Sequence, residues 1–212
     1  LDQYRRNVGR LEHRESRLAI LRNRDFSLYL SARLFSTLAV QMQTVAVGWQ
    51  VYAVTHNPLD LGLIGLSQFL PFVAFILPAG HFADSRDRRR IMTACYALEC
   101  TCALALLAIS LRGLDSAVPV FAVMTLFGVA RAFEMPTLQA LLPALVPVRL
   151  LPRAVASAAS ATQTAIILGP AIGGFLYVAG PAWTYATCAV AYLTAATLSI
   201  LLRYERPVGA NP

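Results

Sequence analysis

The sequence has no lysine, few charged residues and only three histidines. Charged side chains make up 14% of the 212 residues and hydrophobic ones 57%, whereas soluble domains average about 25% charged and about 45–50% apolar residues. An ordinary water-soluble domain is therefore excluded, because a fold of this size could not bury so much apolar surface. The histidines, His13, His56 and His81, lie outside the apolar runs or at their edges, and no H-E-x-x-H motif occurs. We therefore expect no enzyme, no metal site and no other cofactor.

The four cysteines fall inside apolar runs, so they do not form the disulfide framework of a small secreted protein. All 18 basic residues are arginine, and the net charge is +7. A strongly basic chain can bind nucleic acid. Most of these arginines, however, lie in short segments between long apolar runs, which is how membrane proteins place their cations. We expect a lipid bilayer as the partner and no nucleic acid.

Six apolar runs are long enough to cross a bilayer, which takes about 20 residues. They cover approximately residues 27–54, 61–83, 91–111, 117–141, 154–179 and 182–203. The sequence therefore predicts an all-α fold, a polytopic membrane protein with six transmembrane helices. Three regions follow: a cytoplasmic amphipathic segment at 1–25, a six-helix bundle at 26–204, and a cytoplasmic tail or linker at 205–212.

The arginines also predict the orientation of these spans. Fifteen arginines flank the spans on one side and one, Arg112, lies on the other. Because positive residues accumulate on the cytoplasmic side, both termini are expected in the cytoplasm. The expected location is the inner (plasma) membrane of a bacterium.

The loop after the second span carries a motif. It runs from Gly80 through Asp84 into an arginine-rich stretch, and it resembles the G-x-x-x-D-R-x-G-R-R loop of the major facilitator superfamily. Ser85 and Asp87 depart from that pattern. The resemblance implies that the loop latches one conformation of a transporter. The residues concerned are Gly80, Asp84, Arg86, Arg88, Arg89 and Arg90. The alternative is that the arginines only anchor the helix ends on the inner side.

The fifth span contains a second motif, in which Gly169, Pro170, Gly173 and Gly174 match the G-P-x-x-G-G pattern that the superfamily associates with exporters. Small residues of this kind let helix backbones pack closely. Further matches in the first, fourth and fifth spans resemble the branch of the enterobactin exporter and related secretion effectors. Members of this superfamily have two six-helix halves. The resemblance implies that this chain is the amino-terminal half and that a carboxyl-terminal six-helix half is missing.

Four charged residues lie within the predicted spans: Arg33, Glu99, Arg131 and Glu134. A charge in the middle of a bilayer costs about 2.5–3.5 kcal/mol on insertion scales, so it usually has a partner or faces a wet cavity. Arg131 and Glu134 are three residues apart and share one helix face. We hypothesise that Glu134 or Glu99 takes up and releases a proton, with Arg131 tuning its affinity. The alternative is an ion pair that only holds two helices together.

Polar amides in the first span are candidates for contact with the substrate. They are Gln41, Gln43 and Gln50. Hydrogen bonds between helices are the alternative role. Together these patterns predict a secondary active transporter, a proton-coupled exporter of small organic molecules of the siderophore or drug class, working by alternating access. The competing interpretation is a six-helix membrane scaffold or assembly protein that transports nothing.

Overall fold

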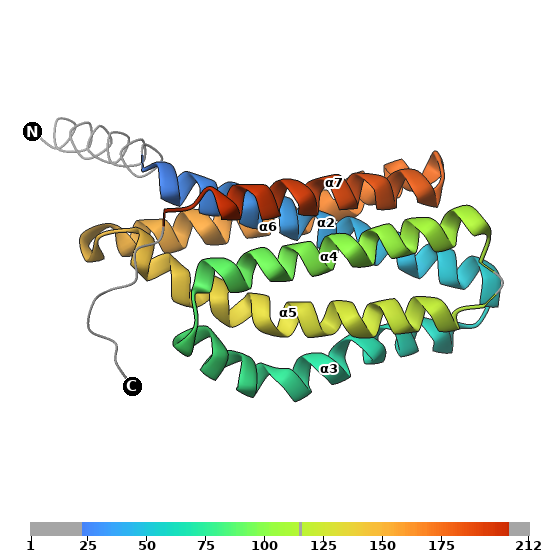
Figure 1. Cartoon of the computed structure of the whole chain (residues 1–212). Coiled ribbons are helices and arrows are strands. Elements are labelled where there is room, and N and C mark those ends of the chain that lie inside the picture. Colours follow the sequence, from blue (N-terminus) through green and yellow to red (C-terminus); the bar gives the residue numbers. More distant parts are fainter. Residues whose placement is uncertain (1–22, 115, 204–212) are drawn as a thin grey trace, which may run out of the picture.

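The computed structural model describes residues 23–114 and 116–203, apart from the side chains of residues 83–85. Throughout this part, the regular structure is helical, and six long helices run back and forth along one common direction (Figure 1). They are α2 (Arg24–Thr55), α3 (Pro58–Ser85), α4 (Arg88–Arg112), α5 (Val118–Leu145), α6 (Leu151–Val178) and α7 (Pro181–Ile200), with a short 3-10 helix η1 (Val148–Leu150) before α6. Every predicted apolar run lies almost wholly within one of these helices, so the all-α fold is confirmed.

The predicted end regions fall largely outside the described residues. Of the amphipathic segment at 1–25, only the last three residues are described, and they form the cap and first turn of α2. The tail at 205–212 is outside the described residues altogether.

Polar caps and turn residues fix where the helices begin and end. The side chains of Asn23, Asn57 and Asp87 accept backbone hydrogen bonds at the starts of α2, α3 and α4, as good N-cap residues do. The turns after α4 and before α7 contain Gly113 and Gly180, which have φ angles of 86° and 123°. Side chains larger than hydrogen are strained at such angles. These short connections force each helix to run antiparallel to the one before it.

Four of the described helices are long and apolar enough to cross a membrane: α3, α4, α5 and α6 together with η1. The other two long helices, α2 and α7, carry more polar side chains. Three glutamines lie in α2, and a series of threonines and tyrosines lies in α7. Length and composition therefore establish a polytopic membrane protein with at least four candidate spans, and leave the six-span arrangement as a prediction.

Each helix packs along its length on one or two main neighbours. α3 packs on α5, α4 packs on both α5 and α7, and α2 packs on α6 and α7. The start of α2 and the end of α7 lie at the same end of the bundle (Figure 1), where the backbone N–H of Arg203 donates to Asp25 over 3.1 Å. Side chains on α2, α4 and α5 therefore meet inside the bundle, far from either end.

Candidate functional site

A layer of charged and polar side chains crosses the middle of the bundle between two apolar clusters. The Tyr96 cluster includes Phe26, Ala32 and Leu138, and the Phe127 cluster includes Ala39, Cys102 and Tyr192. Between them lie Ser36 of α2, Glu99 of α4, and Arg131 and Glu134 of α5, which we call the polar layer.

The layer lies far from the ends of the helices that carry it. Ser36 and Glu99 lie twelve and eleven residues from the starts of α2 and α4, and Glu134 lies eleven residues before the end of α5. These three helix ends lie on the same side of the bundle (Figure 1). At about 1.5 Å per residue the layer is about 17 Å from that side, which is about half of a hydrocarbon core of about 30 Å.

Ser36 joins the two glutamates. Its Oγ lies 3.0 Å from Glu134 Oε1 and 3.4 Å from Glu99 Oε2. Ser36 and Glu99 are 0% exposed and Glu134 is 1% exposed. The structure places Glu99 in the interior, beside Glu134.

Arg131 pairs with Glu134 one turn along α5, as their spacing predicts. The two ends of this pair differ in access, because 22% of the Arg131 side chain is exposed and only 1% of the Glu134 side chain. Arg131 lines a pocket of about 290 Å³ together with Gly65, Gln68 and Phe72 of α3. Arg131 is thus the member of the polar layer that a molecule in this pocket can reach.

Arg33 lies one turn before Ser36 on α2 and bonds to neutral groups. Its Nε donates to the Thr162 hydroxyl of α6 over 3.0 Å, and its Nη1 donates to the Tyr29 hydroxyl over the same distance. The side chain is half-buried between these neighbours. It therefore places a cation inside the bundle whose hydrogen bonds, within the described part of the chain, go to neutral hydroxyl groups.

The three glutamines of α2 occupy different environments. Gln50 is buried, and its Oε1 accepts a hydrogen bond of 2.7 Å from the Tyr185 hydroxyl. Gln43 is 0% exposed, and neither polar atom of its amide has a hydrogen-bond partner in the described part of the chain. Gln41 is half-buried beneath Gly169 of α6. Substrate contact by these three residues stays a prediction. For Gln50, the bond to Tyr185 of α7 favours the alternative role, a hydrogen bond between helices.

The loop between α3 and α4 reaches two other helices. Arg88 Nη1 donates to the carbonyl of Ala140 over 3.0 Å, and Arg89 donates to the carbonyl of Ile200, the last residue of α7. Both acceptors lie near helix carboxyl ends, where cations are stabilised. Arg90 points outward and pairs with Asp87 over 3.4 Å. These contacts hold the loop to the ends of α5 and α7.

The remaining members of the predicted latch take other positions. The Arg86 guanidinium lies 5.2 Å from the centre of the Phe82 ring. The Asp84 side chain is outside the described part of the structure. Within that part, no atom lies within 4 Å of where a Cβ of Gly80 would be, so this glycine does not mark a close helix contact here.

Close helix contacts occur at other glycines. A Cβ on Gly169 would lie 2.5 Å from Gln41 Cβ, and one on Gly173 would lie 2.7 Å from Met42 Cα. A Cβ on Gly128 would overlap the Gln68 carbonyl of α3. At Gly174, by contrast, none of the described atoms lies within 4 Å. The motif in α6 thus packs on α2 through Gly169 and Gly173.

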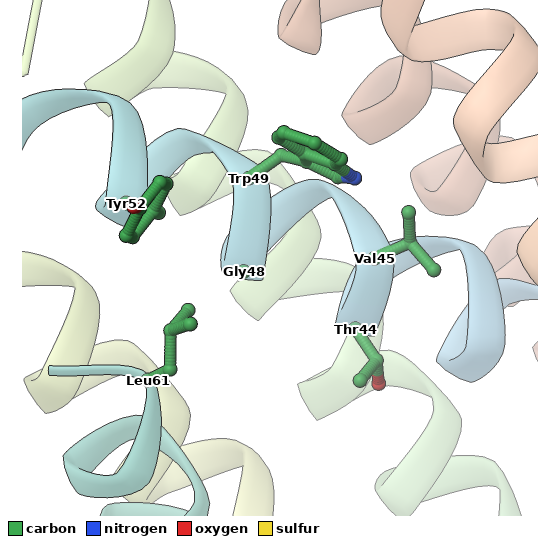
Figure 2. A pocket seen from close by; sticks show the side chains of 6 residues that line it. All are labelled: Thr44, Val45, Gly48, Trp49, Tyr52 and Leu61. Carbon is green, nitrogen blue, oxygen red and sulfur yellow. The ribbon is translucent and has the colours of Figure 1, made fainter. Parts of the chain in front are cut away.

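A second pocket, of about 430 Å³, lies between α2 and α3 near the opposite end of the bundle. Figure 2 shows Trp49 and Tyr52 on the α2 side, Leu61 on the α3 side, and Gly48 facing the space between them. Trp49 is 60% exposed and Tyr52 39% exposed. Exposed tryptophan and tyrosine side chains near the end of a long apolar bundle are typical anchors at a membrane surface.

Sequence reasoning missed several residues of the site. The motifs and charge patterns of the sequence do not single out Ser36, Tyr29, Thr162 or Tyr185. A signal was available, because Tyr29, Ser36, Gln43 and Gln50 follow each other at intervals of seven residues, which places them on one face of α2. All four are buried. Continuing the seven-residue spacing of Gln50 and Gln43 toward the start of α2 leads to Ser36.

The residues that the structure describes contain no group of three His, Cys, Asp or Glu side chains that could hold a metal ion.

Long apolar helices around a buried charged layer define a multi-pass membrane protein. A family model described as "Transmembrane secretion effector" matches residues 15–212. The chain therefore belongs to this family of major facilitator superfamily transporters, and the resemblance read from its motifs is confirmed.

One curated relative supports the same assignment. The chain is 28% identical over 165 residues to the staphyloferrin A transporter of Staphylococcus aureus. The match covers 76% of this chain and 41% of that protein. The chain thus spans less than half of the relative's length in this alignment.

Proposed function

We propose that this chain forms the amino-terminal six-helix half of a secondary active transporter that exports small organic molecules across a bacterial inner membrane. In this proposal all six long helices span the bilayer, and the start of α2 and the end of α7 both face the cytoplasm. The relative's name suggests the siderophore class, with staphyloferrin A as the first molecule to test. A carboxyl-terminal half completes the cavity, and alternating access moves the substrate.

The observation that carries the proposal is the polar layer. Two glutamates and an arginine lie between two apolar clusters in the middle of the bundle; the glutamates are buried and the arginine is partly exposed. Burying charges there is costly, and transporters use such groups to bind coupling ions. We propose that the coupling ion is a proton, taken up and released by the glutamate pair. A scaffold would gain nothing from this arrangement that apolar side chains could not supply.

The loop contacts support a latch between conformations. Arg88 and Arg89 bond to carbonyls of α5 and α7, and those bonds break if the loop moves away from either helix. In this proposal the loop stabilises the conformation seen here and releases it during transport.

Transport across a reconstituted membrane tests the function. The full-length transporter is placed in lipid vesicles, and movement of radiolabelled staphyloferrin A, together with a panel of other small organic molecules, is measured with and without an imposed pH gradient. We expect gradient-driven movement that Glu99→Gln or Glu134→Gln abolishes. Asp60→Asn, at the start of α3, serves as the control and keeps transport. Gradient-driven movement that survives both glutamate changes would refute proton coupling, and movement of no compound would refute the exporter assignment.

Reporter fusions test the orientation. A reporter that is active only in the cytoplasm is fused after Arg203, just beyond the end of α7, or after Arg112, the last residue of α4. Activity at Arg203 and none at Arg112 is expected. The reverse pattern, or activity at both positions, contradicts the six-span arrangement.

A further inference from the structure

The Ser36 hydroxyl has too few hydrogens for its two carboxyl neighbours. Its Oγ is within hydrogen-bond distance of Glu134 Oε1, at 3.0 Å, and of Glu99 Oε2, at 3.4 Å. A serine hydroxyl carries one hydrogen and can donate it to one of these oxygens. An ionised carboxylate has no hydrogen to give. The second contact is therefore a hydrogen bond only if one of the two glutamates is protonated and donates to Ser36.

The partners of Glu134 identify it as the ionised member of the pair. Its two oxygens receive the Ser36 hydroxyl and the Arg131 guanidinium, both of which are donors. A carboxylate with a donor on each oxygen and a paired cation is the arrangement in which a buried negative charge is tolerated.

Glu99 has the opposite surroundings. It is 0% exposed, and its Oε1 has no hydrogen-bond partner among the described residues. Leaving a bare anionic oxygen inside a bundle is far more costly than leaving the carbonyl oxygen of a neutral carboxylic acid. Its other oxygen, Oε2, is the one that faces Ser36.

The charges that face the pair lead to the same assignment. The titratable side chains in electrostatic contact with the two glutamates are Arg131 on α5, Tyr29 on α2, Cys95, Tyr96 and Cys102 on α4, and Tyr192 on α7. Arg131 is the cation in this set, and it faces two carboxyl groups; Arg33, a second cation inside the bundle, bonds to Thr162 and Tyr29 instead. One bound proton makes the buried layer neutral, which is the state that costs least in a membrane.

We propose that Glu99 holds a proton in this conformation, donates it from Oε2 to Ser36, and is linked through the Ser36 hydroxyl to the Glu134 carboxylate. The same chain of hydrogen bonds can move the proton. Glu99 gives its hydrogen to Ser36 Oγ while Ser36 gives its own hydrogen to Glu134 Oε1. Glu99 then becomes the carboxylate and Glu134 the acid, and Ser36 is unchanged. Ser36 is thus a positioning residue between the two proton sites.

The pocket beside Arg131 gives this transfer a trigger. Ser36, Glu99 and Glu134 are sealed, whereas Arg131 is reachable from the pocket that α3 lines. An anionic group that enters the pocket would compete with Glu134 for the guanidinium. Because Glu134 then loses its cation, the proton moves more readily from Glu99 to Glu134. This use of the proton in transport depends on the proposed function, but the position of the proton does not.

Infrared spectroscopy of the purified full-length transporter tests the position. A protonated carboxyl group has a carbonyl stretching band that a carboxylate lacks, and the band shifts when the hydrogen is replaced by deuterium. At neutral pH we expect such a band in the wild type and its loss in Glu99→Gln. In two double variants, Arg131→Met with Glu134→Gln and Arg131→Met with Glu99→Gln, the remaining carboxyl group has no cation beside it and stays neutral, so its band gives the reference frequency for Glu99 or for Glu134. The wild-type band should match the Glu99 reference; no band in the wild type, or a band that matches the Glu134 reference, would overturn the proposal.

The role of Ser36 has its own readout. Ser36→Ala removes the acceptor of the Glu99 hydrogen bond, so the band should remain but move to the frequency of a freer carboxyl group. Ser36→Thr, which keeps a hydroxyl, should restore the wild-type frequency. Ser67→Ala is the matched control, since the Ser67 hydroxyl bonds to the Ile64 carbonyl within its own helix. An unchanged frequency in Ser36→Ala would refute the link between Glu99 and Ser36.

The two experiments can fail separately. A Glu99 band together with transport that ignores the pH gradient would leave the proton position standing and refute proton-coupled transport. Gradient-driven transport without a Glu99 band would support the proposed function and refute the present inference.

Discussion

The hydroxyl of Ser36 on α2 donates a 3.0 Å hydrogen bond to the carboxylate of Glu134 on α5, 98 positions further along the chain. Through this contact α2 is tied to the ion pair on α5, and through the neighbouring Glu99 to α4. Three helices therefore meet at one buried point, whose stability depends on the charges that it holds.

The pair of Arg131 and Glu134 should show strong coupling in a double-mutant cycle. Removing one partner of a buried ion pair costs about 3–5 kcal/mol, because the other charge is left without its counter-charge. Arg131→Met alone should therefore lower the unfolding temperature of the detergent-purified transporter markedly. Arg131→Met combined with Glu134→Gln should recover most of that loss. The measurement is thermal unfolding of both single variants and the double variant. Additive losses would mean that the two side chains do not depend on each other.

Replacing each of two neighbouring glycines of α6 by alanine should change the stability of the protein in different directions. A Cβ at Gly173 would lie 2.7 Å from the Met42 backbone, so Gly173→Ala must push α6 away from α2, at a cost of about 1–3 kcal/mol. At Gly174 the described residues leave the space open. Since alanine is better than glycine in a helix interior by about 0.5–1 kcal/mol, Gly174→Ala should leave stability unchanged or raise it. Thermal unfolding of the two variants checks this, and equal losses at both positions would contradict the packing described.

The sequence was sufficient to predict the helices. The six apolar runs and the turn residues between them gave six helices close to their observed bounds, because hydrophobic length and helix caps are local properties of the chain. The pairing of Arg131 with Glu134 was also predictable, since the two residues share one helix face.

The contacts between helices were not predictable in the same way. Glu99 and Ser36 meet only because α2 and α4, which share few other contacts, approach each other at this depth, a fact of tertiary packing that one sequence does not contain. Gly80 and Gly173 show the same limit. Both match a family motif, yet in the described structure only Gly173 lies against another helix.

The hydrogen bond between Tyr185 and Gln50 should contribute to the packing of α7 on α2. Tyr185→Phe keeps the ring but leaves the buried Gln50 carbonyl oxygen without its donor, which costs about 1–3 kcal/mol. The variant should unfold at a lower temperature than the wild type. Gln50→Leu combined with Tyr185→Phe removes both partners and should be closer to the wild type. If Tyr185→Phe alone were neutral, the hydrogen bond would not stabilise the bundle.

The loop arginines should differ in their effect on transport according to what they touch. Arg88 bonds to the Ala140 carbonyl over 3.0 Å, whereas 88% of the Arg90 side chain is exposed. A hydrogen bond to a charged group is worth about 1.5–3 kcal/mol, and each 1.4 kcal/mol changes an equilibrium about tenfold. If the loop stabilises one conformation, Arg88→Gln should shift the conformational equilibrium about tenfold or more and slow transport. Arg90→Gln should shift it little, because exposed ion pairs contribute about 0–1 kcal/mol. Initial rates of substrate movement into vesicles measure the difference between these neighbouring arginines. Equal rates for Arg88→Gln and the wild type would show that Arg88 helps to anchor the helix ends without controlling their movement, since a contact whose loss leaves the rate unchanged does not limit a transition that breaks it.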